Sequence, residues 1–334
     1  MTSKKETKKN NDTPKGDSPK KILIVGGAGY IGGYLTDLLD HNGFEVVVYD
    51  NLIYEDRFMK KIPFVYGDIR DTDKLSEIIN DFDVVIWLAA IVGDGACSLD
   101  PDLTKKINLT SVEWLVENYN GKIVFTSTCS VYGASPNDSI LQLEDTNPIS
   151  LYATTKLEAE KILLSKAKDP LIFRLGTLFG IGDEHSRIRL DLVVNILTKK
   201  GTLGEPLTVY GGGQWRPLLH VKDVAEAILF GIENDVDGLY NLSNKNYRIK
   251  DVAYEIQKVI PEVVISFYNV KFEDLRNYRV DPKRFKSFGW EPKHSLEKGI
   301  LEIHKIIKEK RIKDPADFNY SNAAFLKNNP LGIL

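Results

Sequence analysis

The sequence contains only two cysteines, Cys97 and Cys129, and no Cys or His spacing near them matches a zinc site. So low a cysteine content argues against a disulfide scaffold, and the missing spacings argue against structural zinc. We therefore expect no metal site. The net charge of −3 provides no overall basic surface, which argues against nucleic acid as a partner.

Long apolar runs are also missing. No stretch approaches the roughly 18 apolar residues of a membrane span, and residues 1–20, mainly Lys, Asn, Asp, Ser and Thr, hold no apolar run that would mark a secretory signal. Because this segment cannot bury enough surface to offset its ordering entropy, it is predicted to be a disordered tail. A contact of its lysines with an anionic surface is the alternative. We expect a cytoplasmic protein with no membrane partner.

Short apolar runs alternate with helical stretches along the first half of the chain. Runs typical of buried strands occur at 22–25, 45–49, 64–66, 84–88, 123–125 and 171–173, and helical patterns at 102–119 and 151–164. This alternation predicts an α/β fold, a doubly wound parallel sheet of the Rossmann type, over residues 21–176. At 334 residues the chain is long enough for an appended lobe as well.

Beyond residue 176 the pattern loosens. Residues 177–206 and 246–334 are predicted to form a smaller C-terminal substrate-binding lobe, while about 207–245 return to the first domain. Here we expect helices near 190–197, 222–232, 249–259 and 296–309, and strands at 207–210 and 263–267. The last twenty residues are expected to be irregular.

The whole chain is organised around Gly26-x-x-Gly29-x-x-Gly32, which follows the strand at 22–25 and opens a helix. In that context, bare backbone and unpaired N–H groups form a site for the pyrophosphate of a dinucleotide. The second strand ends on Asp50, about where an acidic residue receives the adenosine ribose. The alternative is a glycine turn in an ordinary βα unit, with Asp50 a polar residue at a strand end.

Asp50 also bears on the choice of cofactor. Its carboxylate can accept from both ribose hydroxyls, whereas a 2′-phosphate would place two like charges together. Asn51 and Leu52 follow, so no arginine stands directly behind it. The sequence therefore predicts NAD rather than NADP.

Tyr152 and Lys156 lie four residues apart in a predicted helix, so both face the same side. A phenol titrates near 10, too high for a base at neutral pH, but a neighbouring ammonium stabilises the phenolate. The pair therefore indicates a general base with its activator. The alternative is an amphipathic surface pair.

Several motifs together resemble one known family. They are the glycine turn with Asp50, Gly67-Asp68, Ala89-Ala90, Ser127-Thr128 with Val131-Tyr132-Gly133, Tyr152-x-x-x-Lys156, Arg174, the run 216–223, Asn241 and Phe288-Gly289-Trp290-x-Pro292. Over about residues 21–310 the chain resembles the extended short-chain dehydrogenases, and within them the nucleotide-sugar epimerases and dehydratases. The resemblance implies oxidation of a sugar at C4 by a tightly held NAD.

The resemblance also implies residue roles. Tyr152 would take the C4 hydroxyl proton, Lys156 would bind the nicotinamide ribose, and Thr128 would hydrogen-bond the same sugar oxygen. Asn108 would brace the active-site helix. The implied cofactor site comprises Gly26, Gly29, Tyr30, Ile31, Gly32, Asp50, Asn51, Asp68, Ile69, Leu88, Ala89, Ala90, Asn108, Ser127, Tyr152 and Lys156. The implied substrate site comprises Thr128, Cys129, Ser130, Thr177, Arg187, Arg189, Asn195, Arg216, Arg276 and Arg279, with Arg216 on the diphosphate.

The chain departs from the family pattern at three places. Cys129 and Ser130 stand where 4,6-dehydratases carry Asp-Glu, Thr177 where galactose epimerases carry Asn, and Lys271 where many relatives carry a second diphosphate-binding arginine. Arg276 and Arg279 lie near enough to substitute for Lys271. For each candidate arginine, a solvated face is the alternative. No histidine is placed to activate Cys129, so we expect a small buried residue that shapes the pocket.

These features favour NAD-dependent oxidation at C4 of a nucleotide-diphosphate hexose or heptose, in surface-polysaccharide or deoxysugar biosynthesis. The product would be a C4 epimer or a released 4-keto sugar. The alternatives are an NADPH-dependent 4-keto-sugar reductase, a 4,6-dehydratase, and a non-catalytic NAD(H)-binding scaffold. The resemblance further implies a homodimer whose helical seam would use Trp114, Leu115, Ile162 and Leu163.

Overall fold

The computed structural model describes residues 19–134, 140–268 and 276–330. The predicted tail falls almost wholly outside the described residues, as does Lys271. Among the described helices, none is long and apolar enough to cross a membrane.

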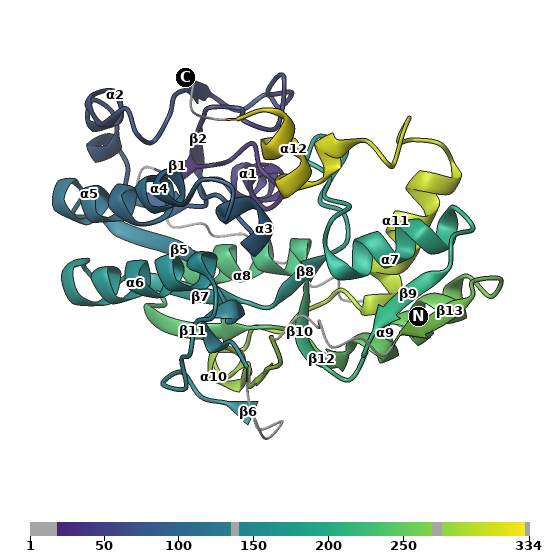
Figure 1. Cartoon of the computed structure of the whole chain (residues 1–334). Coiled ribbons are helices and arrows are strands. Elements are labelled where there is room, and N and C mark those ends of the chain that lie inside the picture. The colour runs from purple at the N-terminus through teal and green to yellow at the C-terminus, as the bar shows by residue number, and fades with distance from the viewer. Residues whose placement is uncertain (1–18, 135–139, 269–275, 331–334) are drawn as a thin grey trace, which may run out of the picture.

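A seven-stranded parallel sheet forms the centre of the protein (Figure 1). Its strands, in spatial order, are β11 (Gly238–Leu242), β7 (Leu171–Leu175), β5 (Lys122–Thr128), β4 (Val84–Trp87), β1 (Lys21–Val25), β2 (Glu45–Asp50) and β3 (Phe64–Tyr66). From β1 the chain first runs outward to β2 and β3 and then crosses back to β4. The strand order therefore reverses beside β1, where doubly wound sheets bind their ligands. The predicted fold class is confirmed.

Both faces of this sheet are covered, as the continuous apolar strands require. Alternate residues of β1 point to opposite sides: Leu23 and Val25 pack into one core with α5 (Ser111–Asn118) and α6 (Leu151–Lys166), while Ile22 and Ile24 pack into the other. That second core includes α1 (Gly32–His41) and α8 (Val221–Glu233). The two-residue period of a strand produces this division.

The helix predicted at 102–119 is one helical run with a wider turn in its middle. It comprises α4 (Pro101–Lys105), a π-helical turn at Lys106–Thr110, and α5. The Asp100 carboxylate caps its start by accepting the N–H of Leu103 at 2.9 Å. Such π turns are frequent at functional sites, and this one carries Asn108.

The remaining elements form smaller sheets and helices beside the sheet. β8 (Thr177–Phe179), β10 (Trp215–His220) and β12 (Lys245–Arg248) pair, as do β9 (Leu207–Tyr210) and β13 (Ile265–Tyr268). α7 (Val193–Thr202), α9 (Ile249–Val259) and α11 (Leu296–Lys308) share an apolar core with them. The rest of the secondary structure is short, with β6 (Ile140–Leu141), β14 (Arg279–Val280), α2 (Thr72–Ser76), α3 (Asp94–Cys97) and α10 (Lys283–Lys286).

Two expectations were wrong. The chain end is not wholly irregular, because a turn at Phe318–Tyr320 leads into α12 (Asn322–Asn328), which packs against α3 (Figure 1). In the expected seam, Leu115 and Leu163 are fully buried in the protein's own core, so neither side chain can reach a partner. Periodicity over short windows does not distinguish a helix face that packs inward from one that packs on a second subunit.

Candidate active site

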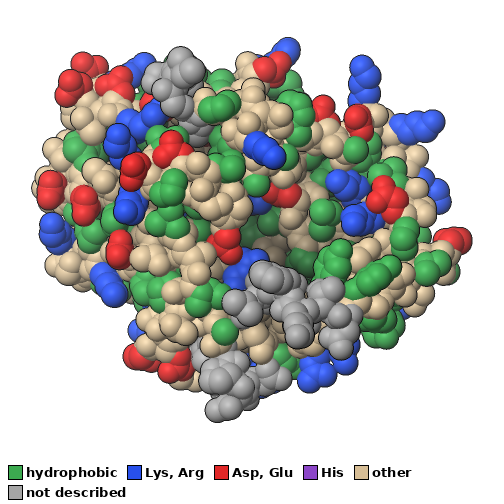
Figure 2. Space-filling model, viewed as in Figure 1, with side chains coloured by type: hydrophobic (Ala, Val, Ile, Leu, Met, Phe, Trp, Pro, Cys, Tyr) green, Lys and Arg blue, Asp and Glu red, His purple; other side chains and the backbone are tan. Residues whose placement is uncertain are grey.

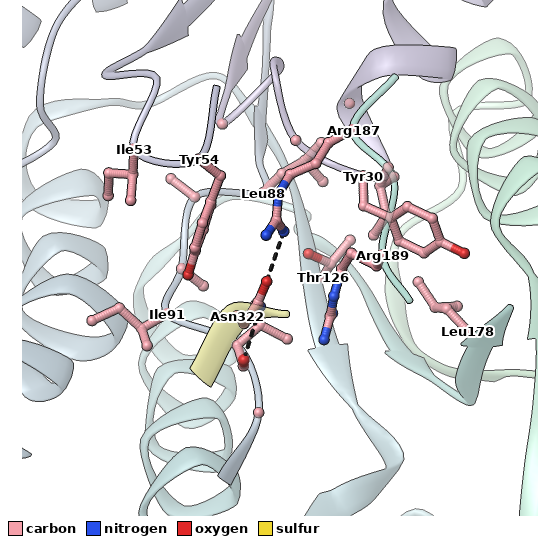
Figure 3. A pocket seen from close by; sticks show the side chains of 18 of the residues that line it. Tyr30, Ile53, Tyr54, Leu88, Ile91, Thr126, Leu178, Arg187, Arg189 and Asn322 are labelled. Atoms are coloured by element: carbon pink, nitrogen blue, oxygen red, sulfur yellow. Dashed lines mark hydrogen bonds between the residues drawn. The ribbon is translucent and has the colours of Figure 1, made fainter. Parts of the chain in front are cut away.

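A cavity opens at the carboxyl ends of β1, β4 and β5, beside the point where the strand order reverses. Its wall joins the glycine turn, the ends of β2 and β5, the start of α6 and loops of the second half of the chain. The face in Figure 2 is hollowed near its centre, and charged side chains border the opening. Figure 3 shows the interior, where Tyr54, Asn322 and the pair Arg187 and Arg189 come from three separate segments.

The glycine turn is shaped by close backbone contacts. Gly26 has φ +87°, and a Cβ there would lie 2.5 Å from the backbone nitrogen of Ala89. A Cβ on Gly32 would lie 2.5 Å from Gly27 Cα. Only glycine fits, because the turn packs directly on the next strand end and on itself. The turn therefore presents bare backbone to the cavity, as a pyrophosphate site requires.

Asp50 is held at the cavity wall by its own loop. Its Oδ2 accepts the N–H of Ala28 at 3.0 Å, and Oδ1 accepts the N–H of Leu52 at 2.8 Å. Burial raises the pKa of Asp50, and these N–H groups oppose that shift. Each carboxylate oxygen retains acceptor capacity for a ribose hydroxyl.

The neighbouring Asp68 is fixed in the same way. Its carboxylate accepts both Arg70 Nε and Nη2 at 2.8 Å, and Asn51 Nδ2 at 2.8 Å. These hydrogen bonds hold the pKa of Asp68 below its usual range, against its partial burial.

Thr128, Tyr152 and Lys156 all line the cavity. Thr128 ends β5, and its Oγ1 accepts the N–H of Ser130 at 3.1 Å. Tyr152 and Lys156 project from the first two turns of α6, whose start is capped by Ser150 Oγ accepting the N–H of Ala153 at 3.2 Å. A strand end and a capped helix therefore position the three side chains rigidly.

The electrostatics of this group differ from the expectation. Burial raises the pKa of Tyr152 above its usual range, and a hydrogen bond with Thr128 only partly opposes it. Burial also lowers the pKa of Lys156 to about 8, and its Nζ donates to Thr126 O at 2.9 Å. In the protein alone, desolvation therefore outweighs the lowering of the Tyr152 pKa that we predicted from the neighbouring Lys156. When bound, oxidised nicotinamide supplies the hydride acceptor and a further positive charge beside the phenol.

A buried ion pair supports this wall from behind. Arg174 Nη2 lies 2.7 Å from Glu160 Oε2, and both side chains are almost fully buried. The Ser127 hydroxyl donates to Glu160 as well. Glu160 was missed in the sequence, although an arginine inside the apolar strand 171–175 signals a buried carboxylate partner. This pair joins β5, α6 and β7.

Most of the predicted cofactor and substrate residues share this one cavity. They are Gly26, Gly29, Tyr30, Ile31, Gly32, Asp50, Asn51, Asp68, Ile69, Leu88, Ala89, Ala90, Ser127, Thr128, Ser130, Tyr152, Lys156, Thr177, Arg187, Arg189 and Arg276. Arg189 donates from Nε and Nη2 to Asp191 at 3.0 Å. Arg276 Nη1 lies 3.3 Å from Asp94 Oδ2.

Two predicted substrate residues with short side chains, Cys129 and Asn195, lie behind the described wall of the cavity. Cys129 is fully buried and its Sγ donates to the carbonyl oxygen of Arg174 at 3.3 Å, while burial raises the pKa of its thiol. Asn195 is also fully buried, and its Nδ2 donates to Arg189 O at 2.7 Å. Cys129 is committed to a backbone group, and Asn195 to backbone groups and the Tyr30 hydroxyl.

Asn108, Arg216 and Arg279 also lie outside the described wall. Asn108 exchanges hydrogen bonds of 2.9 Å with the backbone of Ile91, so it braces that loop. Arg216 donates to the backbone of Arg276 and of its own neighbour Trp215. Arg279 stacks on the Trp215 ring at 4.9 Å.

The expectation of no metal stays a prediction. Among the described residues, Asp223, Glu226 and His294 gather away from the cavity. Asp223 already accepts the N–H of Lys293 and His294 Nδ1 on one oxygen and the N–H of His294 on the other. These bonds account for the burial of the carboxylate without an ion.

The sheet, the glycine turn at its reversal point and the Tyr152–Lys156 pair beside it define an NAD-dependent enzyme of the Rossmann class. Comparison with known proteins agrees. The model of the NAD dependent epimerase/dehydratase family matches residues 22–243, and the chain belongs to this family. NAD is accordingly its cofactor, and the family acts on nucleotide sugars.

Individual relatives catalyse different reactions. The UDP-N-acetyl-alpha-D-glucosaminuronate decarboxylase of Bacillus cytotoxicus is 27% identical over 325 residues, covering 87% of this chain and 98% of the relative. The putative UDP-glucose 4-epimerase of Methanocaldococcus jannaschii is 29% identical over 300 residues, covering 84% and 96%. The Thermus thermophilus UDP-glucose 4-epimerase, solved with NAD, is 26% identical, with TM-score 0.74 and coverage of 85% and 98%.

Proposed function

We propose that this protein oxidises a nucleotide-diphosphate sugar, a hexose or heptose, at C4 with NAD, and forms a C4 epimer or a 4-keto sugar. The observation that carries the proposal is the position of Thr128, Tyr152 and Lys156 in the same cavity as the glycine turn and Asp50. The Tyr152 phenolate takes the O4 proton as the hydride leaves C4. Thr128 holds that oxygen, and Lys156 favours the phenolate.

Elimination of water, the dehydratase reaction, lacks its acid and base here. That reaction needs one group to take the C5 proton and another to protonate the departing 6-hydroxyl. Cys129 is buried behind the wall, and the hydroxyl oxygen of Ser130 lies 3.4 Å from that of Tyr278. Among the described residues of the wall, the carboxylates are Asp50 at the end of β2, Glu55 in the loop after it, and Asp68 after β3. The oxidised intermediate therefore keeps its 6-substituent.

Reaction in D₂O with UDP-, GDP-, CDP- and dTDP-linked sugars tests this proposal. Nuclear magnetic resonance of the product and absorbance of NADH distinguish the outcomes. We expect either an epimer without solvent deuterium at C4, or one equivalent of 4-keto sugar with one equivalent of NADH. Tyr152→Phe is the matched control and should form neither. A 6-deoxy-4-keto product with deuterium at C5 would contradict the roles given to Cys129 and Ser130.

The homodimer remains a prediction from the family resemblance. α5 and α6 lie side by side, at the left of Figure 1. With Leu115 and Leu163 buried, the outer seam consists of Trp114, Ile162 and Leu164, of which Leu164 is 48% exposed. Light scattering at micromolar concentration should show a dimer, and Leu164→Glu should shift it toward monomer. A wild-type monomer would reject this assignment.

A further inference from the structure

The segment that carries Arg187 is pressed against the glycine turn. A Cβ on Gly33, in the first turn of α1, would lie 2.7 Å from Ser186 Cα. The backbone just before Arg187 therefore touches the N-terminal turn of the helix where a dinucleotide pyrophosphate binds. From there the Arg187 side chain enters the cavity (Figure 3).

No carboxylate hydrogen-bonds the Arg187 guanidinium among the described residues. Its side chain is 6% exposed, Nη1 donates to Asn322 Oδ1 at 2.7 Å, and Nη2 donates to Asn319 O at 3.5 Å. Its Nε has no hydrogen-bond partner among the residues that the structure describes. Both accepting atoms are neutral. The buried positive charge of Arg187 is therefore not neutralised by its hydrogen-bond acceptors, and its buried Nε–H is not hydrogen-bonded to a described residue.

A second arginine and two carboxylates lie near Arg187. Burial and the nearby Arg189 together lower the pKa of Arg187 to about 10, although Tyr54, Asp191 and Glu55 oppose the shift. Of these carboxylates, Asp191 accepts both donors of Arg189 and the N–H of Asn322, and among the described residues Glu55 makes no hydrogen bond to the Arg187 guanidinium. An anionic ligand in the cavity would balance the remaining charge.

We propose that Arg187 binds the pyrophosphate of NAD, and that residues 318–328, here named the C-terminal clasp, hold it there. Asn322 of the clasp hydrogen-bonds two segments: Arg187 and Asp191 in one and, through Nδ2 at 3.0 Å, Val92 O in the other. Through Asn322 the clasp forms part of the cavity wall. This assignment moves Arg187 from the predicted sugar-nucleotide site to the cofactor.

An aromatic contact fixes the guanidinium from its other face. Arg187 Cζ lies 3.8 Å from the centre of the Tyr54 ring, and Phe325 of the clasp packs edge-on against the same ring at 5.1 Å. The Leu190 N–H donates to Tyr320 O at 2.9 Å. A planar cation fixed in this way is preorganised for two oxygens of a diphosphate.

The clasp also has a consequence for turnover. An epimerisation returns the hydride to the sugar, so the cofactor has to stay bound between the two hydride transfers. Asn322 is a positioning residue here, since it acts through Arg187. The inference depends on NAD binding and not on which sugar the protein oxidises, so it can fail or hold independently of the proposed reaction.

The first test compares NADH binding by wild type and Arg187→Gln, measured by NADH fluorescence. We expect the dissociation constant to rise roughly 10- to 100-fold, because charge-assisted hydrogen bonds to phosphate are lost. Adenosine, which has no phosphate, should bind both proteins equally. Arg284→Gln is the matched control, because Arg284 also stacks on a tyrosine, Tyr240 at 5.1 Å, away from the cavity.

The second test uses Asn322→Ala, which leaves the arginine in place. NADH release should be faster than in wild type by roughly 3- to 10-fold. If Arg187→Gln does not fold, Asn322→Ala decides the question. An unchanged NADH release rate in Asn322→Ala would overturn the proposal. A folded Arg187→Gln variant could instead bind NADH as tightly as wild type and show a raised half-saturation constant for the sugar nucleotide. That result would return Arg187 to the substrate site.

Discussion

Thr128, Tyr152 and Lys156 reach the cavity from the end of β5 and the first turns of α6, whereas Arg187, Arg189 and Arg276 reach it from segments outside the central sheet. The first group, the catalytic wall, stands on the central sheet and is backed by the buried Glu160–Arg174 pair. The second group, the arginine wall, is held by contacts between distant segments, such as Arg187 with Asn322.

This difference separates two kinds of chemistry. The catalytic wall places a proton acceptor within one helical turn of a cation, a geometry that i, i+4 spacing provides by itself. The arginines of the arginine wall bind anions, and their positions depend on how the segments outside the central sheet pack against it. Variants of the catalytic wall should therefore change turnover, and variants of the arginine wall should change affinity.

The largest expected effect is that of Tyr152→Phe. Loss of the general base should lower turnover 10²- to 10⁴-fold with NAD binding retained, because the ring that packs the site remains. Product formation and NADH binding are the measurements. Tyr119→Phe is the control, since that phenol donates to Phe82 O at 3.1 Å away from the cavity. More than about a third of wild-type rate in Tyr152→Phe would place the base elsewhere.

Asp50→Asn tests the adenosine end of the cavity. Wild type should bind NAD more tightly than NADP, and the variant should lose roughly 10- to 100-fold in NAD affinity, because hydrogen bonds to a charged acceptor contribute about 1.5–3 kcal/mol. Titration with each cofactor measures the preference. Asp73→Asn, on α2, is the control. Equal or tighter binding of NADP by wild type would refute the assignment of Asp50.

Arg276→Gln addresses the arginine wall. We expect the half-saturation constant for the sugar nucleotide to rise about tenfold, with turnover much less affected, because a planar cation near the substrate contributes mainly to binding. Steady-state kinetics measure both constants, and Arg284→Gln serves as control. If turnover falls while half-saturation stays constant, the division between the two walls does not hold.

The last prediction concerns a change with pH in the stability of the apo-protein. Because burial lowers the pKa of Lys156 from 10.5 to about 8, the unfolded chain binds this proton more readily between those values. The free energy of unfolding of wild type should therefore rise relative to Lys156→Met as pH increases from 8 to 10.5. Urea unfolding across this range measures the difference. Lys161→Met, exposed on the same helix, should show no such trend.

Much of the fold was predictable because its signals are local. The strand at 207–210 and the helix at 249–259 agree with β9 and α9 in their bounds. Apolar runs of four or five residues, glycine turns and capping residues act over one or two turns of chain. The short strands β8, β10 and β12 were not anticipated, because Arg216 and Pro217 interrupt the apolar pattern of β10 and its pairing partners are distant in the chain.

For the site, the sequence by itself predicted the glycine turn, Asp50 and the Tyr152–Lys156 pair, since each depends on spacing within one strand–turn–helix unit or one helix. Thr128 was predicted through the family resemblance. Only the tertiary structure decided which arginines enter the cavity, that Cys129 and Arg216 do not line its described wall, and that Asn322, from the last turns of the chain, does. The physical reason is that burial and pairing of a charge depend on neighbours far away in the sequence. Asn322 lies 135 residues from the Arg187 that it contacts.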